Sequence, residues 1–358
     1  MPTAELGLNL MPGSSMSKGY AYQNIPSRPD IPFHRGESDW RARRIMELAD
    51  VTGKTVYDLG CSVGTISGIL SQKAKRVVGI DYDLASIELA RSLYPNVEFI
   101  LSDIDSNFLK GMESHSICIW TSQFMWMVKQ KGIEAALDFV WDLSKKCDVL
   151  IFETATRDDG QAPLDISQDD IFSLLIKNTV YQDIVDHGPW NDGWTPRNVF
   201  VCQKPFVEHR GDWSSIRMEK RGEVIKEFKD QYFSRELKKR EAECLQREEL
   251  SGFVPAFISD NECAIKMSYE GFPAKWLPSL DINIILAGLD VSKIKHRDIR
   301  PSNLLWNGNR VVLIDFSFAT IGDEITNYHY DLGGAYKCPY GFNDEYSLKK
   351  VQAELSRA

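Results

Sequence analysis

The chain has 358 residues, 43% of them hydrophobic and 26% charged, which is enough for two domains that each bury a core. Its formal net charge of −9 offers no broad cationic field, so a long nucleic acid is not expected as a partner. Seven cysteines without a C-x-x-C pair, and no secretory leader, favour reduced thiols in a cytoplasmic protein. Apolar runs such as 282–289 are much shorter than the roughly 20 residues of a membrane span, so we expect a soluble chain.

Apolar runs and loop-forming residues predict the order of the elements. Residues 1–30 are rich in Gly, Pro, Ser and Asn, which favour loops, and predict a flexible arm. Further along, apolar runs alternate with helical patterns, which is typical of βαβ units and a parallel sheet. The predicted strands are 55–60, 76–81, 97–103, 116–122, 148–153 and 197–205. The alternation stops at 206–215, so we predict a first domain over 31–208 and a second over 209–358.

A turn of small residues lies in YDLGCSVGTISGIL (57–70), between a predicted strand and a predicted helix. Gly60 and Gly64 would let the backbone pass close to a bound cofactor, and the start of the helix offers free N–H groups. About 20 residues after the turn, Asp81 ends a strand, where its carboxylate can accept both hydroxyls of a ribose. Asp103 follows the next predicted strand.

In this order, the glycine turn and the two acids resemble the class I S-adenosylmethionine-dependent methyltransferases over residues 40–205. The resemblance implies a doubly wound, Rossmann-like α/β sheet that binds S-adenosylmethionine. It places the cofactor site at Asp58, Gly60, Cys61, Gly64, Asp81 and Asp103. The alternative is a Rossmann domain that binds NAD or nothing, but the turn lacks the third spaced glycine of dinucleotide-binding folds.

The second half contains His-Arg-Asp and then Asn at the spacing H-R-D-x-x-x-x-N, over residues 296–303. A predicted buried strand then leads to Asp315. In this pattern Asp298 would orient an attacking hydroxyl and accept its proton. Asn303 and Asp315 would be oxygen ligands for Mg²⁺ on the phosphates of ATP.

A lysine and a glutamate upstream complete this pattern. The predicted strand 222–228 carries Lys226, which would steady the ATP phosphates. In 233–246 apolar residues recur every four positions, and Glu241 lies on that apolar stripe. Because an unpaired carboxylate is costly there, we predict that Glu241 pairs with Lys226.

These motifs resemble the protein-kinase-like superfamily over residues 210–345, which implies a small α+β domain that binds ATP and Mg²⁺. No glycine-rich loop precedes Lys226, so the hairpin 217–223 would have to cover the phosphates. Asp-Phe-Ser replaces Asp-Phe-Gly. Arg300 stands where protein kinases usually carry Lys, and in this it is closer to the small-molecule and sugar kinases of the superfamily. We therefore assign Arg300 to substrate binding. The alternative is a pseudokinase scaffold.

A methyltransferase-like half followed by a kinase-like half is similar to the domain order of the bifunctional kinase–methyltransferases that terminate bacterial O-antigen chains. Those enzymes phosphorylate the non-reducing sugar terminus and then methylate the phosphate. The likeness extends to residues 22–25, 153–159 and 194–201, and implies a catalytic Tyr22 and phosphate-binding Arg157 and Arg197. QFMWMV (123–128) replaces the His pair of that family, and the Trp and Met residues around it are expected in the core.

Methylation of a phosphate is compatible with the missing His pair. The second pKa of a phosphate monoester is about 6, so the acceptor oxygen is largely ionised at pH 7 and needs positioning more than a base. We therefore predict an enzyme that phosphorylates a hydroxyl, on a glycan or a small molecule, and methylates the product. A membrane-associated partner in glycan synthesis would place it at the inner face of the membrane. Two alternatives remain: a methyltransferase of a small molecule or RNA with an inactive kinase-like scaffold, and a non-catalytic assembly protein for glycan synthesis.

Overall fold

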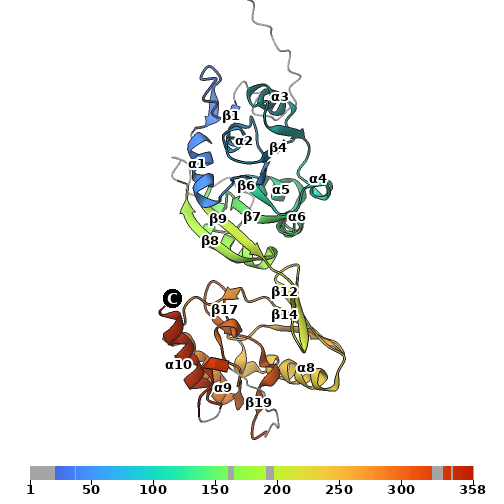
Figure 1. The fold of residues 1–358 in the computed structure, drawn as a ribbon, viewed down its shortest axis with the longest axis vertical. Helices are drawn as coiled ribbons and strands as arrows, with labels where there is room; N and C mark the ends of the chain where they lie inside the picture. The colour runs from blue at the N-terminus through green and yellow to red at the C-terminus, as the bar shows by residue number, and fades with distance from the viewer. Residues whose placement is uncertain are drawn as a thin grey trace, which may run out of the picture. The chain divides into compact units, whose positions relative to one another are not determined.

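The computed structural model describes residues 21–36, 38–159, 165–190, 197–324, 334–339 and 342–357 (Figure 1). The chain divides into two compact units, residues 1–205 and 206–358. Most of the predicted arm, residues 1–20, lies outside the described residues, as do residues 194–196 of the segment 194–201. Within the described residues, no helix combines the length and the apolar character that crossing a membrane requires.

A seven-stranded sheet with the order β5-β4-β3-β6-β7-β9-β8 forms the centre of the first unit. Its parallel strands are β3 (Thr55–Leu59), β4 (Arg76–Asp81), β5 (Glu98–Leu101), β6 (Ser116–Thr121) and β7 (Cys147–Glu153). β9 (Asn198–Pro205) runs antiparallel to β7, and β8 (Tyr181–Pro189) runs antiparallel to β9. The prediction of a parallel sheet is confirmed for five strands. The last two form an antiparallel hairpin, because their link is too short for the crossover that parallel neighbours need.

Helices cover both faces of this sheet, as a doubly wound fold requires. On one face, α1 (Ser38–Leu48), α2 (Thr65–Leu70) and α3 (Leu84–Leu93) share a buried core with the strands. On the other, Phe108 of α4 (Ser106–Gly111) contacts Tyr57, and Phe139 of α6 (Ile133–Ser144) contacts Trp120. The unit also contains α5 (Phe124–Lys131), α7 (Gln168–Asn178) and the short parallel pair β1 (Ala21–Gln23) and β2 (Phe33–Arg35).

A five-stranded sheet with the order β10-β11-β12-β14-β13 begins the second unit. Its strands are β10 (His209–Arg210), β11 (Ser214–Glu219), β12 (Glu223–Phe228), β13 (Phe257–Asp260) and β14 (Ala264–Ser268), all paired antiparallel. Helix α8 (Tyr232–Leu245) buries Leu237 and Leu245 in the same core as Ile265 of the sheet.

The rest of the second unit is mainly helical. It contains α9 (Ser279–Val291), α10 (Asp344–Leu355), the three-stranded sheet β15 (Phe272–Pro273), β17 (Leu304–Trp306) and β18 (Val311–Leu313), and the pair β16 (Ile294–Lys295) and β19 (Thr320–Ile321). Ile285 of α9 and Leu348 of α10 belong to the core that also contains Leu237 of α8. The predicted α+β architecture of this half is confirmed.

Candidate active sites

A cavity of about 310 Å³ in the first unit lies where the parallel strands end. This is the edge at which open α/β sheets bind their ligands. Four predicted site residues line it: Tyr22, Gly60, Asp81 and Asp103. The sequence did not indicate that Ser62, Asp83, Trp120, Ser122, Gln123 and Trp126 also line it.

The turn between β3 and α2 needs glycine at two positions. Gly60 has φ 82° and Gly64 has φ 75°, values that side chains rarely allow. A Cβ on Gly60 would lie 2.3 Å from the Gln123 side chain, and one on Gly64 would lie 2.5 Å from Phe99. A side chain at either position would therefore collide with its neighbours, and glycine lets the backbone of the turn adopt this conformation.

Cys61 lies in this turn, but its side chain is buried in the core and does not line the cavity. Burial raises the pKa of the Cys61 thiol well above its usual value. Any contact of Cys61 with a cofactor would therefore come from its backbone.

Asp81 ends β4 and presents a carboxylate to the cavity. One of its oxygens accepts a hydrogen bond from the Ser62 backbone N–H at 2.8 Å, and the other accepts from the Asp83 backbone N–H at 3.0 Å. Burial raises the pKa of Asp81. Each carboxylate oxygen keeps a lone pair for a ligand hydroxyl, so the geometry is compatible with the predicted ribose contact.

Asp58, by contrast, lies behind the turn. It is buried and accepts a hydrogen bond from the Ser67 hydroxyl at 2.6 Å, which fixes α2 to β3. Burial raises the pKa of Asp58 to about 6. Since Asp58 does not line the cavity, any effect on a cofactor would pass through the turn.

Three buried polar atoms of the cavity residues have no hydrogen-bond partner among the described residues: Ser62 Oγ, Asp83 Oδ1 and Trp120 Nε1. A buried polar group without a partner costs about 1–3 kcal/mol, so native proteins rarely leave one unused. All three atoms are buried beneath the surface of the cavity. The cavity itself is lined by polar side chains and by the 44% exposed Trp126 indole, so it suits a ligand that is both polar and aromatic.

Tyr22 reaches the cavity because its strand, β1, is tied to the glycine turn. The Gln23 side chain accepts a hydrogen bond from the Thr65 backbone N–H at 3.2 Å. The Thr65 hydroxyl donates to the Asn24 carbonyl oxygen at 2.8 Å. These bonds attach the strand of Tyr22 to the start of α2, and Tyr22 and Gly60 both line the cavity.

A buried carboxylate, Glu153, lies at the end of β7 next to the cavity. It is held by Arg41 at 2.8 Å and by Arg197 at 3.1 Å, and it accepts from the Ser122 hydroxyl at 3.1 Å. Arg197 also donates to Asp159 at 2.8 Å. Arg197 is thus fixed by side chains far apart in the sequence.

Arg157, the other predicted phosphate ligand, differs from Arg197. It is exposed at the start of a 3-10 turn, Arg157–Asp159. Neither arginine lines the cavity as the described residues form it.

In the second unit, an ion cluster forms around the lysine of β12. Lys226 donates to Glu241 of α8 at 2.6 Å, to Asp315 at 2.7 Å and to the Ser317 hydroxyl at 3.0 Å. The Lys226–Glu241 pair is the one that the helix periodicity predicted. Burial raises the pKa of Asp315, but the Lys226 ammonium outweighs this and lowers the pKa to about 2. Asp315 is therefore held as a carboxylate, the form that binds a metal ion.

Ser317 is the residue of this cluster that the sequence did not mark. Its hydroxyl accepts from Lys226 and donates to Glu241. It occupies the position of the glycine in Asp-Phe-Gly. Here it adds a polar link between the lysine and the helix.

The loop 296–303 brings Asp298, Asn303 and Arg300 together. Asp298 is 1% exposed, and its carboxylate accepts from Arg300 at 2.8 Å and from the Asn303 amide at 3.2 Å. The Asn303 amide also donates to the Asp298 carbonyl oxygen at 2.8 Å. These bonds fix the Asp298 carboxylate beside the predicted metal ligand.

His296 connects this loop to the segment that carries Asp315. One ring nitrogen lies 2.9 Å from the Ile314 carbonyl oxygen, and the other accepts from the Asp298 backbone N–H at 3.3 Å. Its ring also packs edge-on against Phe316. Asp315 has φ 67°, a left-handed conformation that is strained for a non-glycine residue and is often found at functional sites.

Two family models match the chain. One, a methyltransferase domain, covers residues 56–146, and the other, the phosphotransferase enzyme family, covers residues 274–353. Among curated relatives, methyltransferase 235L of Invertebrate iridescent virus 6 is 40% identical over 62 residues, 17% of this chain and 23% of that protein. Phosphoethanolamine N-methyltransferase 1 of Triticum aestivum is 32% identical over 84 residues, 22% of this chain and 17% of that protein. These matches span less than a quarter of the relatives' own length.

Solved structures with similar folds include the bifunctional kinase–methyltransferase WbdD, 19% identical over 86% of this chain and 82% of that chain, with a TM-score of 0.45. The magnesium protoporphyrin IX methyltransferase of Synechocystis PCC 6803 is 20% identical over 47% of this chain and 78% of that chain, with a TM-score of 0.37. The two family models confirm the predicted order: the chain joins a methyltransferase domain to a kinase-like domain of the phosphotransferase enzyme family.

Proposed function

We propose that this protein phosphorylates a hydroxyl at a glycan terminus with ATP and then methylates the new phosphate with S-adenosylmethionine. The main support is that Lys226, Glu241, Asp298, Asn303 and Asp315 occur together in a chain that also carries a methyltransferase domain. The Lys226–Glu241 ion pair and the Asp298–Asn303 hydrogen bond, which such a kinase would use, support this proposal.

The cavity of the first unit fits S-adenosylmethionine. Its adenosyl part has a ribose for Asp81 and an aromatic base that can pack against the exposed Trp126 indole. When bound, the cofactor supplies an electrophilic methyl group on a sulfonium. The residues of the chain bind it, hold the phosphate in line with the methyl group and exclude water.

The acceptor side of this reaction needs donors for a phosphate. Tyr22 lines the cavity and is a hydroxyl donor. Arg197 is fixed beside the cavity by Glu153 and Asp159, and exposed Arg157 lies in the turn that ends with Asp159. We propose that these three groups bind the phosphate, which needs no general base because it is already ionised.

In the second unit, Asp298 orients the acceptor hydroxyl and takes its proton. Arg300, about half exposed and bonded to Asp298, lies where it can contact the acceptor. Asn303 and Asp315 would hold Mg²⁺, and Lys226 would contact the ATP phosphates. When bound, ATP would supply the phosphoryl group and leave as ADP, and Mg²⁺ would offset the charge of the phosphates.

The test uses two single variants of the kinase site and two acceptors. Asp315→Ala should lose Mg²⁺-dependent ATP binding, whereas Asp298→Ala should bind Mg-ATP normally but lose turnover. Asp298→Ala should also lose methyl transfer to an unphosphorylated glycan and keep methyl transfer to the same glycan phosphorylated chemically. ATP binding that ignores both Mg²⁺ and Asp315→Ala would instead favour an inactive scaffold. Methylation of the unphosphorylated glycan by Asp298→Ala would disprove the sequential reaction.

A further inference from the structure

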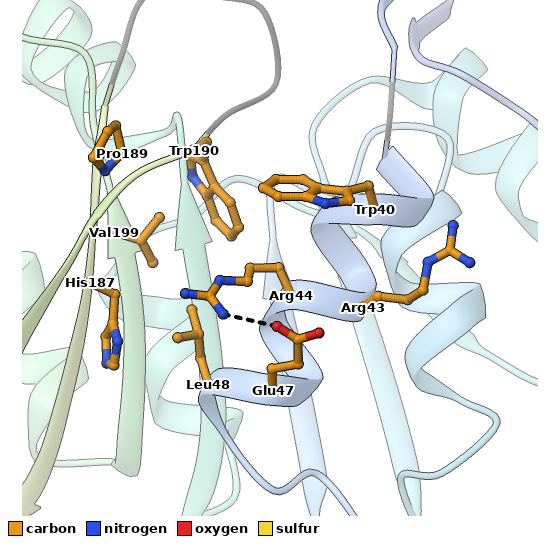
Figure 2. A pocket seen from close by; sticks show the side chains of 9 residues that line it. All are labelled: Trp40, Arg43, Arg44, Glu47, Leu48, His187, Pro189, Trp190 and Val199. Atoms are coloured by element: carbon orange, nitrogen blue, oxygen red, sulfur yellow. Dashed lines mark hydrogen bonds and ion pairs between the residues drawn. The ribbon is translucent and has the colours of Figure 1, made fainter.

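A second pocket of the first unit, of about 340 Å³, lies between α1 and the β8–β9 hairpin (Figure 2). α1 contributes Trp40, Arg44 and Glu47, and His187 and Trp190 come from β8 and the residue after it. The proposed reactions use none of these side chains.

Two indoles form the aromatic end of this pocket. Trp40 and Trp190 meet edge to face, with ring centroids 5.8 Å apart. The Arg41 guanidinium lies 4.8 Å from the Trp190 ring, so Trp190 is fixed from another side. Trp190 is only 4% exposed, and its Nε1 has no hydrogen-bond partner among the described residues. This end is therefore held in place by packing on two sides.

The other end of the pocket is polar. Figure 2 shows the Arg44–Glu47 ion pair below the two indoles, with a 2.9 Å contact, while the side chain of Arg43 points away. Burial and the nearby Arg44 lower the pKa of His187, which favours the neutral ring with its one donor and one acceptor. Arg44, Glu47 and His187 therefore offer both hydrogen-bond donors and acceptors to the pocket.

We infer that this pocket binds a sugar ring of the acceptor glycan, at a distance from the sugar that reacts. The inference rests on the proposed glycan acceptor. A sugar ring has an apolar C–H face for an indole and hydroxyls that both donate and accept, which matches the two ends of the pocket. A bare phosphate would meet the Glu47 carboxylate, and the net charge of −9 disfavours a nucleic acid.

The pocket is connected to the methyl-transfer cavity through packed side chains. Arg41, which covers Trp190, is bonded to Glu153 at 2.8 Å, and Glu153 accepts from Ser122, which lines the cavity. The strand register pairs Pro189 with Asn198 and Phe152 with Phe200. Trp190 therefore lies at the sheet edge where β7 ends, which is also the edge of the cavity. The inference requires one extended glycan to span the two sites.

The binding test uses the full-length protein and needs no activity. An array of neutral oligosaccharides, with a short single-stranded RNA as a rival ligand, first selects a glycan that the wild type binds. Calorimetry with that glycan then compares the wild type with Trp40→Ala and Trp40→Phe. Trp276→Ala is the matched control, because it removes a 49% exposed indole from the second unit. Calorimetry with S-adenosylmethionine checks that the first unit of each variant is folded, and hydrogen exchange of α8 checks the second unit of Trp276→Ala.

We expect Trp40→Ala to weaken glycan binding by about tenfold, since an aromatic contact contributes on the order of this factor. Trp40→Phe should keep most of the affinity, and Trp276→Ala should keep all of it. Equal affinity of Trp40→Ala and the wild type, no glycan binding by the wild type, or binding of RNA alone would each overturn the inference. Methylation of a phosphorylated monosaccharide by the wild type tests the proposed function separately, because its failure would leave the binding comparison readable.

Discussion

Ser317 joins the lysine and the glutamate of the kinase-like site, and its removal should destabilise the second unit. Its hydroxyl donates to Glu241 at 2.5 Å and accepts from Lys226 at 3.0 Å, and all three residues are at most 5% exposed. Ser317→Ala removes both bonds without adding volume. We predict a loss of stability because water does not replace the hydroxyl in such a buried cluster.

The size of the expected stability loss depends on which contacts of Lys226 remain in Ser317→Ala. A hydrogen bond to a charged group contributes about 1.5–3 kcal/mol. After the change, Lys226 still contacts Glu241 and Asp315, so the loss is nearer to one such bond than to two. We expect the free energy of unfolding of the second unit to fall by about 1.5–3 kcal/mol.

Ser234 provides the matched control, since it is also a buried serine of the second unit. It lies on α8, is 0% exposed, and its hydroxyl has no hydrogen-bond partner among the described residues. Ser234→Ala should therefore leave the stability unchanged or raise it, because it removes a buried polar group that is not satisfied.

Hydrogen exchange of the α8 amides measures both variants, because a chain of two domains has no single free energy of unfolding. Ser317→Ala should lower amide protection by a factor on the order of 10 to 100. Unchanged protection in Ser317→Ala would refute the reasoning. An equal loss in Ser234→Ala would refute it as well, since any buried serine would then have the same effect.

Three further predictions concern the first unit. Asp81→Ala should weaken S-adenosylmethionine binding by roughly 2–3 kcal/mol in calorimetry and leave Mg-ATP binding unchanged; an unchanged cofactor affinity would exclude a ribose contact. Burial raises the pKa of Asp58 from 3.8 to about 6, so its contribution to stability is present below about pH 4 and lost as the pH rises through 6. Asp58→Asn should flatten this part of the pH profile of unfolding, and a profile parallel to that of the wild type would contradict the burial argument. Glu153→Gln leaves Arg41 and Arg197 with less compensating charge and should cost about 3–5 kcal/mol, seen as lost exchange protection in β7; a loss under about 1 kcal/mol would show that the arginines find other partners.

The parallel strands of the first unit could be predicted because each is a continuous apolar run, as expected when both faces of a sheet are covered. β8 could not. Its sequence, YQDIVDHGP, carries four polar or charged residues, because it lies at the edge of the sheet and is only partly buried. The two-residue strands β15, β16 and β19 are also beyond prediction, since tertiary packing alone decides such short pairings.

The kinase-like residues were predictable for a local reason. Asp298 and Asn303 lie on one short loop, and a fixed spacing marks them. Trp126 shows the opposite case. It was expected in the core with its neighbours, and Trp120 and Met127 are indeed buried, but Trp126 is 44% exposed and lines the cavity. Indoles suit a core and a binding surface equally, so composition does not separate the two.

The cluster around Glu153 has no local signal at all, because its members come from α1, from the ends of β6 and β7 and from the start of β9. It nevertheless bears on the proposed phosphate contact of Arg197. The bonds to Asp159, Glu153 and Ser122 use Nε and Nη1 of Arg197, and Nη2 takes part in none of them. An arginine fixed in this way loses little side-chain entropy when it binds an anion through its remaining donors. Glu153 would therefore act as a positioning residue: it compensates the charge of Arg197 in the resting protein and holds the guanidinium in one orientation for the phosphate.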